Sequence, residues 1–212
     1  MYIEDFVQAK RELRYWRELL QEWVFLVHRV YRVSNKKSAV YAEKERANTG
    51  LLAAAAVKNG WVALEESRTD KYRKISDRKT YKGKCDLVLW RDQKHHEIEA
   101  KFAYHVLFSK SKDRIDRLYH KAISDSYRST FSGHRSGKKI AITYVVPVIS
   151  PARLEKQNES ELAAELKSLM KSIKKTYNPE LLSCAFPGPI DLQVKTKRKA
   201  LGVILFGEMT SG

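Results

Sequence analysis

The chain has 212 residues, 43% of them hydrophobic, which is enough for one sizeable core and excludes an intrinsically disordered protein. The longest apolar run, residues 51–57, is too short to span a bilayer, so we expect no membrane partner. A formal net charge of +16 attracts polyanions, and it favours a nucleic-acid-binding protein over one that is merely soluble. The chain shows no secretory signal, and its two cysteines, Cys85 and Cys184, are too few for a disulfide framework. We therefore expect a cytoplasmic protein with buried free thiols.

An N-terminal amphipathic helix is predicted within residues 1–37. Apolar residues between Tyr2 and Val30 recur at alternating spacings of four and three, which is a helical period. The stripe contains bulky aromatic residues, which favour a helix packed on its own domain. A homodimer or a partner protein joined through this helix is the alternative. Residues 1–37 are thus expected to be a helical extension of a main domain at residues 38–212.

A second helix is predicted at residues 38–59, with Gly60 as its C-terminal cap, followed by a short strand at residues 61–65. Residues 68–84 are then predicted to form a loop. They are dense in Lys and Arg and contain Tyr72 and Tyr81. Such a charge run is often only a solvated loop, but its position directly before Asp86 favours a loop that binds phosphates.

Residues 85–102 are predicted to form two strands joined by a polar turn, and the second strand carries unusual charges. Glu97, Glu99 and Lys101 alternate with apolar residues there, so the three ionisable side chains share one face. Ionisable groups on a half-buried strand are costly to desolvate unless they meet a metal, each other or water. These charges therefore need an explanation in chemistry.

The rest of the chain alternates predicted helices and strands. Helical spacing predicts helices at residues 112–128 and 159–177, the second with Asn158 as its N-cap. Residues 140–149 form a β-branched run that reads as a buried strand, whose end Pro147 marks. Shorter strands are expected at residues 181–186 and 201–206, with a basic cluster at residues 195–199 between them. The fold class is therefore α/β, with a central mixed β-sheet flanked by helices.

Asp86 and Glu99, on neighbouring strands, can bring two carboxylates close together. Two adjacent carboxylates do not both stay ionised cheaply without a cation, and Mg²⁺ is the hard, oxygen-seeking ion that suits them. Lys101, two residues after Glu99 on the same face, is placed to hold or polarise an attacking water. Together these residues predict a phosphodiester hydrolase.

The motif formed by Asp86, twelve intervening residues and Glu99-Ala100-Lys101 resembles the PD-(D/E)xK nuclease superfamily. The resemblance covers roughly residues 38–149, and Cys85 stands where the signature has proline. It implies a restriction-endonuclease-like core that binds Mg²⁺, for which Mn²⁺ can substitute. The implied ligands are Asp86, Glu99 and the backbone carbonyl of Ala100, with Lys101 assisting the nucleophilic water.

Many members of this superfamily contribute one more glutamate, from the helix before the first strand. Glu45 is the preferred candidate because it shares a helical face with Thr49 and Leu52, whereas Glu43 points away from them. Two exposed glutamates are the alternative. His95 and His96, at the turn, are expected to be exposed and are given no metal role. Glu97 lies on the same face as Glu99, one pleat earlier, where a solvated strand-end position is expected and a spare metal ligand is the alternative.

The resulting hypothesis is a magnesium-dependent endonuclease that hydrolyses phosphodiester bonds, with DNA as the expected substrate. A non-catalytic nucleic-acid-binding or partner-binding module with the same fold is the first alternative. An RNA nuclease is the second, since nothing in the sequence shows whether a 2′-hydroxyl is read. Binding of backbone phosphates is assigned to eight basic residues: Arg73, Lys74, Arg78, Lys79, Lys82, Lys84, Lys197 and Arg198.

Overall fold

The computed structural model describes residues 4–36, 40–73, 79–109, 111–130, 137–191 and 198–210. Its strands form one mixed sheet in the order β1-β7-β10-β6-β4-β3-β2-β5, with the short pair β8 and β9 attached to β6. The parallel pair is β4 with β6, and the other pairings are antiparallel. The bounds are β1 (Phe6–Ala9), β2 (Val62–Tyr72), β3 (Thr80–Arg91), β4 (Lys94–Val106), β5 (Ser129–Thr130), β6 (Lys138–Ile149), β7 (Leu181–Ala185), β8 (Ile190–Asp191), β9 (Lys199–Ala200) and β10 (Val203–Thr210).

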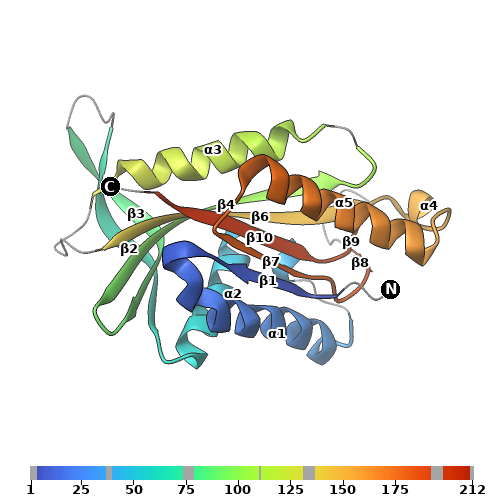
Figure 1. Ribbon diagram of the computed structural model, residues 1–212, viewed down its shortest axis with the longest axis horizontal. Coiled ribbons are helices and arrows are strands. Elements are labelled where there is room, and N and C mark those ends of the chain that lie inside the picture. Colours follow the sequence, from blue (N-terminus) through green and yellow to red (C-terminus); the bar gives the residue numbers. More distant parts are fainter. Residues whose placement is uncertain are drawn as a thin grey trace.

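Helices cover both faces of this sheet (Figure 1), which confirms the predicted α/β class. One layer contains α1 (Arg17–Val33) and α2 (Glu45–Lys58), and the other contains α3 (Asp113–Arg128) and α5 (Glu159–Tyr177). The short helix α4 (Pro151–Leu154) precedes α5, and the 3₁₀ turns η1 (Arg11–Trp16) and η2 (Val40–Ala42) precede α1 and α2. Each layer has its own core of buried apolar side chains. None of the helices in the described residues is long and apolar enough to cross a membrane.

The N-terminal segment differs from the predicted continuous helix. Its first element is the strand β1, which pairs with β7 at the edge of the sheet, and the helix α1 begins only at Arg17. A strand of four residues is too short to show a period of its own in the sequence, so it falls within the helical spacing of the following residues. The pairing partner of β1 lies about 175 residues further along the chain, and local periodicity does not reveal such a partner. Leu13 and Trp16 of η1 are fully buried in the same core as α1 and α2. The described part of this segment is therefore built into the main sheet and core.

The basic segment at residues 68–84 is also not the predicted loop. β2 continues to Tyr72 and β3 begins at Thr80, so most of this segment is a two-stranded ribbon. The charges that suggest a loop form cross-strand ion pairs instead: Lys82 lies 2.9 Å from Asp70, and Lys84 lies 2.7 Å from Glu66. The candidate phosphate ligands Lys74 and Arg78 lie outside the described residues, as does Lys197.

Most other predicted elements are confirmed, although α2 begins at Glu45 rather than at residue 38. α2 is followed by Gly60 in a left-handed conformation, with a φ of +76° that glycine adopts without strain. α5 has the predicted cap: the Asn158 side chain accepts a hydrogen bond from the backbone N–H of Glu161, whose own side chain accepts one from the Asn158 backbone. Pro147 does not end β6, which continues two residues further. Cys85 and Cys184 are buried free thiols, as expected.

Candidate active site

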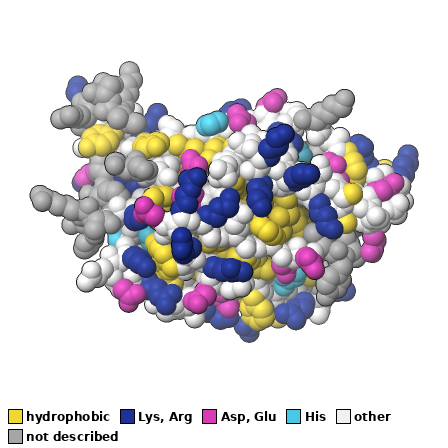
Figure 2. Space-filling model, in the orientation of Figure 1, with side chains coloured by type: hydrophobic (Ala, Val, Ile, Leu, Met, Phe, Trp, Pro, Cys, Tyr) yellow, Lys and Arg dark blue, Asp and Glu magenta, His cyan; other side chains and the backbone are white. Residues whose placement is uncertain are grey.

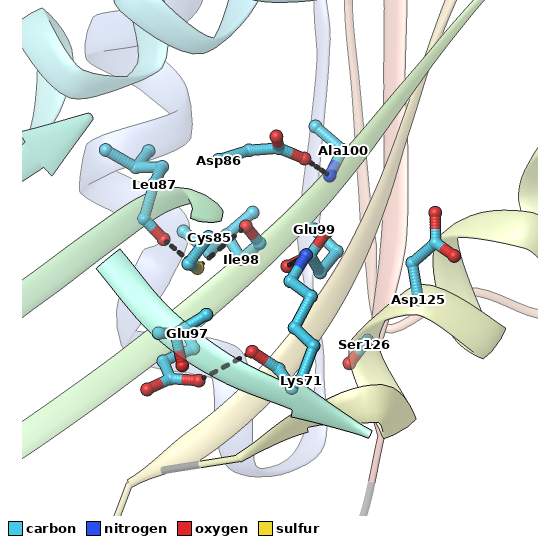
Figure 3. Close-up of polar contacts among 12 residues, drawn as sticks. Lys71, Cys85, Asp86, Leu87, Glu97, Ile98, Glu99, Ala100, Asp125 and Ser126 are labelled. Atoms are coloured by element: carbon cyan, nitrogen blue, oxygen red, sulfur yellow. Dashed lines mark hydrogen bonds and ion pairs between the residues drawn. The ribbon is translucent and has the colours of Figure 1, made fainter. Parts of the chain in front are cut away.

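The candidate site lies where β3 and β4 separate. The ladder between these strands runs from the pair Arg91–Lys94 to the pair Leu87–Ile98 and ends there. Beyond it, the Asp86 side chain takes the place of a strand partner, because its Oδ2 accepts a 2.8 Å hydrogen bond from the backbone N–H of Ala100 (Figure 3). This contact fixes the Asp86 carboxylate beside the Glu99-Ala100-Lys101 segment of β4.

Glu99 is almost completely buried, with 3% of its side chain exposed, and its Oε1 lies 2.6 Å from the Nζ atom of Lys71. Burial raises the pKa of Glu99 to about 7, and the negative charge of Asp86 adds to this effect. The Lys71 ammonium acts in the opposite direction. The Glu99 carboxylate is thus held at high energy, with one cation in contact with it.

The Lys101 ammonium group lies between the side chains of Glu45 and Asp86. Its Nζ donates a hydrogen bond to the Ala100 carbonyl at 2.5 Å, and it lies 3.9 Å from Oε1 of Glu45 and 3.9 Å from Oδ2 of Asp86. Glu45 is the first residue of α2, and burial followed by the charges of Asp86 and Asp125 raises its pKa against the influence of Lys101. Asp86, Glu99, Lys101 and Glu45 therefore come together in one place. Glu45 contacts Lys101 through its side chain. Glu43 makes backbone contacts: its carbonyl accepts a hydrogen bond from the Tyr104 hydroxyl, and its N–H donates one to the Val40 carbonyl.

The donor atoms of this cluster suit a hard divalent cation. The carboxylates of Glu45, Asp86 and Glu99 and the carbonyl of Ala100 offer only oxygen, which is what Mg²⁺ and Mn²⁺ prefer. A cation already lies among three of these groups, since the Lys101 ammonium contacts Glu45, Asp86 and the Ala100 carbonyl. Within the described residues, no set of three or more His, Cys, Asp or Glu side chains converges closely enough to hold a metal as it stands. The oxygen donors suit such an ion, and in this structure the lysine ammonium groups contact the same oxygen atoms that would bind it.

Two residues of the cluster were not predicted. Asp125 of α3 places Oδ2 3.5 Å from the Lys101 Nζ, and it also pairs with Lys121 one helical turn earlier. Lys71 of β2 contacts Glu99. The four carboxylates of Glu45, Asp86, Glu99 and Asp125 therefore surround two nearly buried ammonium groups. Asp125 carries no sequence signal beyond its place on the polar side of a helix, and Lys71 fell in the predicted loop, where no facing direction could be assigned.

Glu97 is buried rather than solvated, with 3% exposure. Its Oε2 accepts a 3.1 Å hydrogen bond from the hydroxyl of Ser129, the residue that connects α3 to β5. Lys139 is its register partner on β6; burial lowers the pKa of Lys139, and the charge of Glu97 opposes this. Glu97 is the strand-end residue of the prediction, but the neighbouring strand β6 and the end of α3 cover it.

His95 and His96 are also buried, contrary to the prediction of an exposed turn, with 6% and 1% exposure. The His96 Nε2 lies 2.7 Å from the Tyr15 hydroxyl, and its ring packs among Trp16 and Trp61. Burial and the charge of His95 lower the pKa of His96 to about 3, which keeps its imidazole neutral. The reason for the difference is η1, which covers the turn end of β4 with aromatic side chains that the sequence placed in a longer helix.

Of the predicted phosphate ligands that are described, those on the β2–β3 ribbon are exposed and Arg198 is partly buried. Arg73 and Lys79 are exposed at the end of the β2–β3 ribbon, and Lys82 and Lys84 lie along it. Arg198 lines a hollow of about 330 Å³ with Arg114 and Tyr104. Figure 2 shows Lys and Arg side chains scattered across one face of the molecule, between acidic and apolar side chains. With a net charge of +16, this surface attracts a polyanion.

Comparison of the chain with protein-family models, with curated proteins and with solved structures found no match.

Proposed function

We propose that the protein is a metal-dependent nuclease that hydrolyses phosphodiester bonds in DNA by the chemistry of the PD-(D/E)xK superfamily. The observation that carries the proposal is the convergence of Glu45, Asp86 and the Ala100 carbonyl on one ammonium group, next to the buried Glu99. The four carboxylates of Glu45, Asp86, Glu99 and Asp125 face three ammonium groups, those of Lys71, Lys101 and the more exposed Lys121, so one negative charge is left over when all four are ionised. Such an excess is costly in a protein interior and suits a divalent cation.

In this proposal, Mg²⁺ or Mn²⁺ is held by Asp86, Glu99, the Ala100 carbonyl and Glu45. When bound, the ion lowers the pKa of a water molecule and stabilises the charge that develops on the phosphate. The chain itself does the rest. Lys101 leaves the Ala100 carbonyl and orients the attacking water with its ammonium, and Arg73 and Lys79 bind backbone phosphates and so position the duplex.

One specific observation favours a second candidate function. Lysines contact Glu99, Glu45, Asp86 and Asp125, so the same cluster can be read as a structural ion-pair network that needs no metal. The protein would then be a nucleic-acid-binding module that does not cut. The salt-dependent binding expected from its positive charge would be the same in both cases.

A cleavage assay separates these functions. The protein is incubated with supercoiled plasmid, single-stranded DNA and RNA in the presence of Mg²⁺, Mn²⁺ or a chelator. We expect cleavage of DNA that requires the divalent ion and is lost in Asp86→Asn and Lys101→Met. Cleavage of RNA but not of DNA would show that the protein is an RNA nuclease. Binding of nucleic acid without cleavage in either Mg²⁺ or Mn²⁺ would support the binding module.

Glu43→Gln and Glu45→Gln form a matched pair for this assay, because Glu45 is the first residue of α2 and contacts Lys101, whereas Glu43 lies two residues before the helix and uses its backbone carbonyl to contact Tyr104. Glu45→Gln is expected to slow cleavage at least about tenfold, whereas Glu43→Gln should cleave like the unmodified protein. Equal effects of the two substitutions would remove Glu45 from the site.

A further inference from the structure

Lys71 makes a contact that neither the motif nor the proposed mechanism requires. It belongs to β2, whereas its partner Glu99 belongs to β4, and β3 lies between these two strands. Its side chain therefore crosses over β3 to place Nζ 2.6 Å from Glu99 Oε1, as the extended lysine in Figure 3 shows. With 12% exposure for Lys71 and 3% for Glu99, this ion pair is almost withdrawn from water.

Gly83 of β3 provides the space for this crossing. A Cβ atom at position 83 would lie 2.9 Å from Cδ and 3.0 Å from Cγ of Lys71, closer than side-chain carbons approach one another. Both atoms are in the middle of the lysine chain, so the chain would have to leave its path. The glycine and the lysine thus form a unit: the missing side chain at Gly83 is the space that directs Lys71 onto Glu99.

We propose that Lys71 is a displaceable counter-ion of the site: its ammonium occupies Glu99 when no divalent ion is bound, competes with that ion for the carboxylate, and contacts the substrate phosphate once displaced. This inference rests on the proposed function. A divalent ion binds a carboxylate oxygen at about 2.1 Å, so an ammonium in contact with the same carboxylate repels it across a few ångströms of low dielectric.

The proposed role of Lys71 can be distinguished by measurement from a purely structural one. If Lys71 only supported the fold, its removal would weaken ion binding and cleavage together. A competing counter-ion has opposite effects on the two: its removal strengthens ion binding and weakens cleavage, because the phosphate loses a cation.

The test is calorimetric titration of the ion-free protein with Mn²⁺, with cleavage measured separately at saturating Mn²⁺. Lys71→Met and Gly83→Ala are compared with the unmodified protein. Both are expected to bind Mn²⁺ about tenfold more tightly and to cleave at least about tenfold more slowly. Gly83→Ala keeps the lysine and changes only its path, so it tests the proposal even if Lys71→Met folds poorly.

Lys58→Met is the matched control, because Lys58 also pairs with a glutamate, Glu22, but on the outer surface of α1 and α2. It should leave Mn²⁺ affinity unchanged. Equal or weaker Mn²⁺ binding in Lys71→Met and Gly83→Ala, with normal binding and cleavage by the unmodified protein, would overturn the inference and leave the proposed function intact. If the unmodified protein bound no Mn²⁺ and cut no nucleic acid, the inference and the proposed function would both be wrong.

Discussion

Glu99 is the residue on which the electrostatics of the candidate site depend. It is buried, it lies beside a second carboxylate, and an ammonium from another strand is its close partner. A carboxylate in this position costs folding free energy whenever it is ionised, unless a cation compensates for it. The site therefore stores a cost that a divalent ion would relieve.

This cost predicts how stability depends on pH. The pKa of Glu99 is raised from 4.5 to about 7 in the folded protein, so the folded state binds more protons than the unfolded state between these values. The stability associated with Glu99 is present below about pH 4.5 and is lost as pH rises through about 7. Relative to Glu99→Gln, the unmodified protein should lose up to ~3 kcal/mol of unfolding free energy over this range.

Urea denaturation in chelator at a series of pH values from acidic to neutral measures this difference. A constant difference between Glu99→Gln and the unmodified protein would show that Glu99 does not titrate there. Added Mg²⁺ should stabilise the unmodified protein at neutral pH and have a smaller effect on the variant, since the ion binds through the missing carboxylate.

Among the site residues, those separated by a short stretch of sequence could be predicted, and those brought together only by the fold could not. Asp86, Glu99 and Lys101 lie on two adjacent strands connected by a tight turn, so their proximity follows from alternation and register. Lys71 and Asp125 reach the cluster from β2 and α3. Their positions depend on which strands are neighbours and on how a helix packs, and a single sequence does not encode either in a local pattern.

The β2–β3 ribbon is the element that most changes the interpretation of the chain. A basic segment predicted to be a loop is instead an antiparallel ribbon that carries Arg73 and Lys79 near its end and directs Lys71 into the site. Charged residues hide the alternation of a strand when both faces of the ribbon reach water. The helices α3 and α5 and the β3–β4 hairpin were predictable because each buries an apolar stripe or face with a clear period.

If the ribbon binds backbone phosphates, its charges should determine the salt dependence of binding. The double variant Arg73→Ala, Lys79→Ala should reduce the slope of log affinity against log salt by up to ~2 for duplex DNA, about one unit for each lost phosphate contact. Fluorescence anisotropy with labelled duplex in chelator gives this slope without cleavage.

The control for this prediction is Lys167→Ala, Lys171→Ala on the exposed side of α5, which removes the same charge from another element. This control should change the slope much less. If the two double variants lost the same slope, net charge rather than the ribbon would account for binding.

The whole molecule is one sheet with a helical layer on each face, and it includes the N-terminal segment that was predicted to be an extension of the main domain. β1 forms the edge of the sheet beside β7, and η1 contributes Leu13 and Trp16 to the core that α1 and α2 share. The N-terminal segment therefore contributes to the stability of the main domain. The α/β class and the mixed sheet were predictable from the order of apolar runs. The edge strand β1 was not, because its pairing partner β7 lies at the other end of the chain.

Trp16 tests this integration. It is fully buried and packs edge-on against Trp61 and His96, so Trp16→Ala should lower the unfolding free energy by about 3–5 kcal/mol, as measured by urea denaturation. The neighbouring exposed residue provides the control: Arg17→Ala should change stability by less than about 0.5 kcal/mol. A loss below about 1 kcal/mol for Trp16→Ala would mean that the segment contributes little to the domain.

The most direct measurement for the whole account is the rate at which supercoiled plasmid is cut by the unmodified protein and by Glu99→Gln, which removes one negative charge without changing the shape of the side chain. We predict cleavage that requires Mg²⁺ or Mn²⁺, stops in chelator, and falls at least about a hundredfold in Glu99→Gln although the variant still binds DNA. Cleavage at the same rate in Glu99→Gln, or no cleavage by the folded, DNA-bound protein in either ion, would contradict the account.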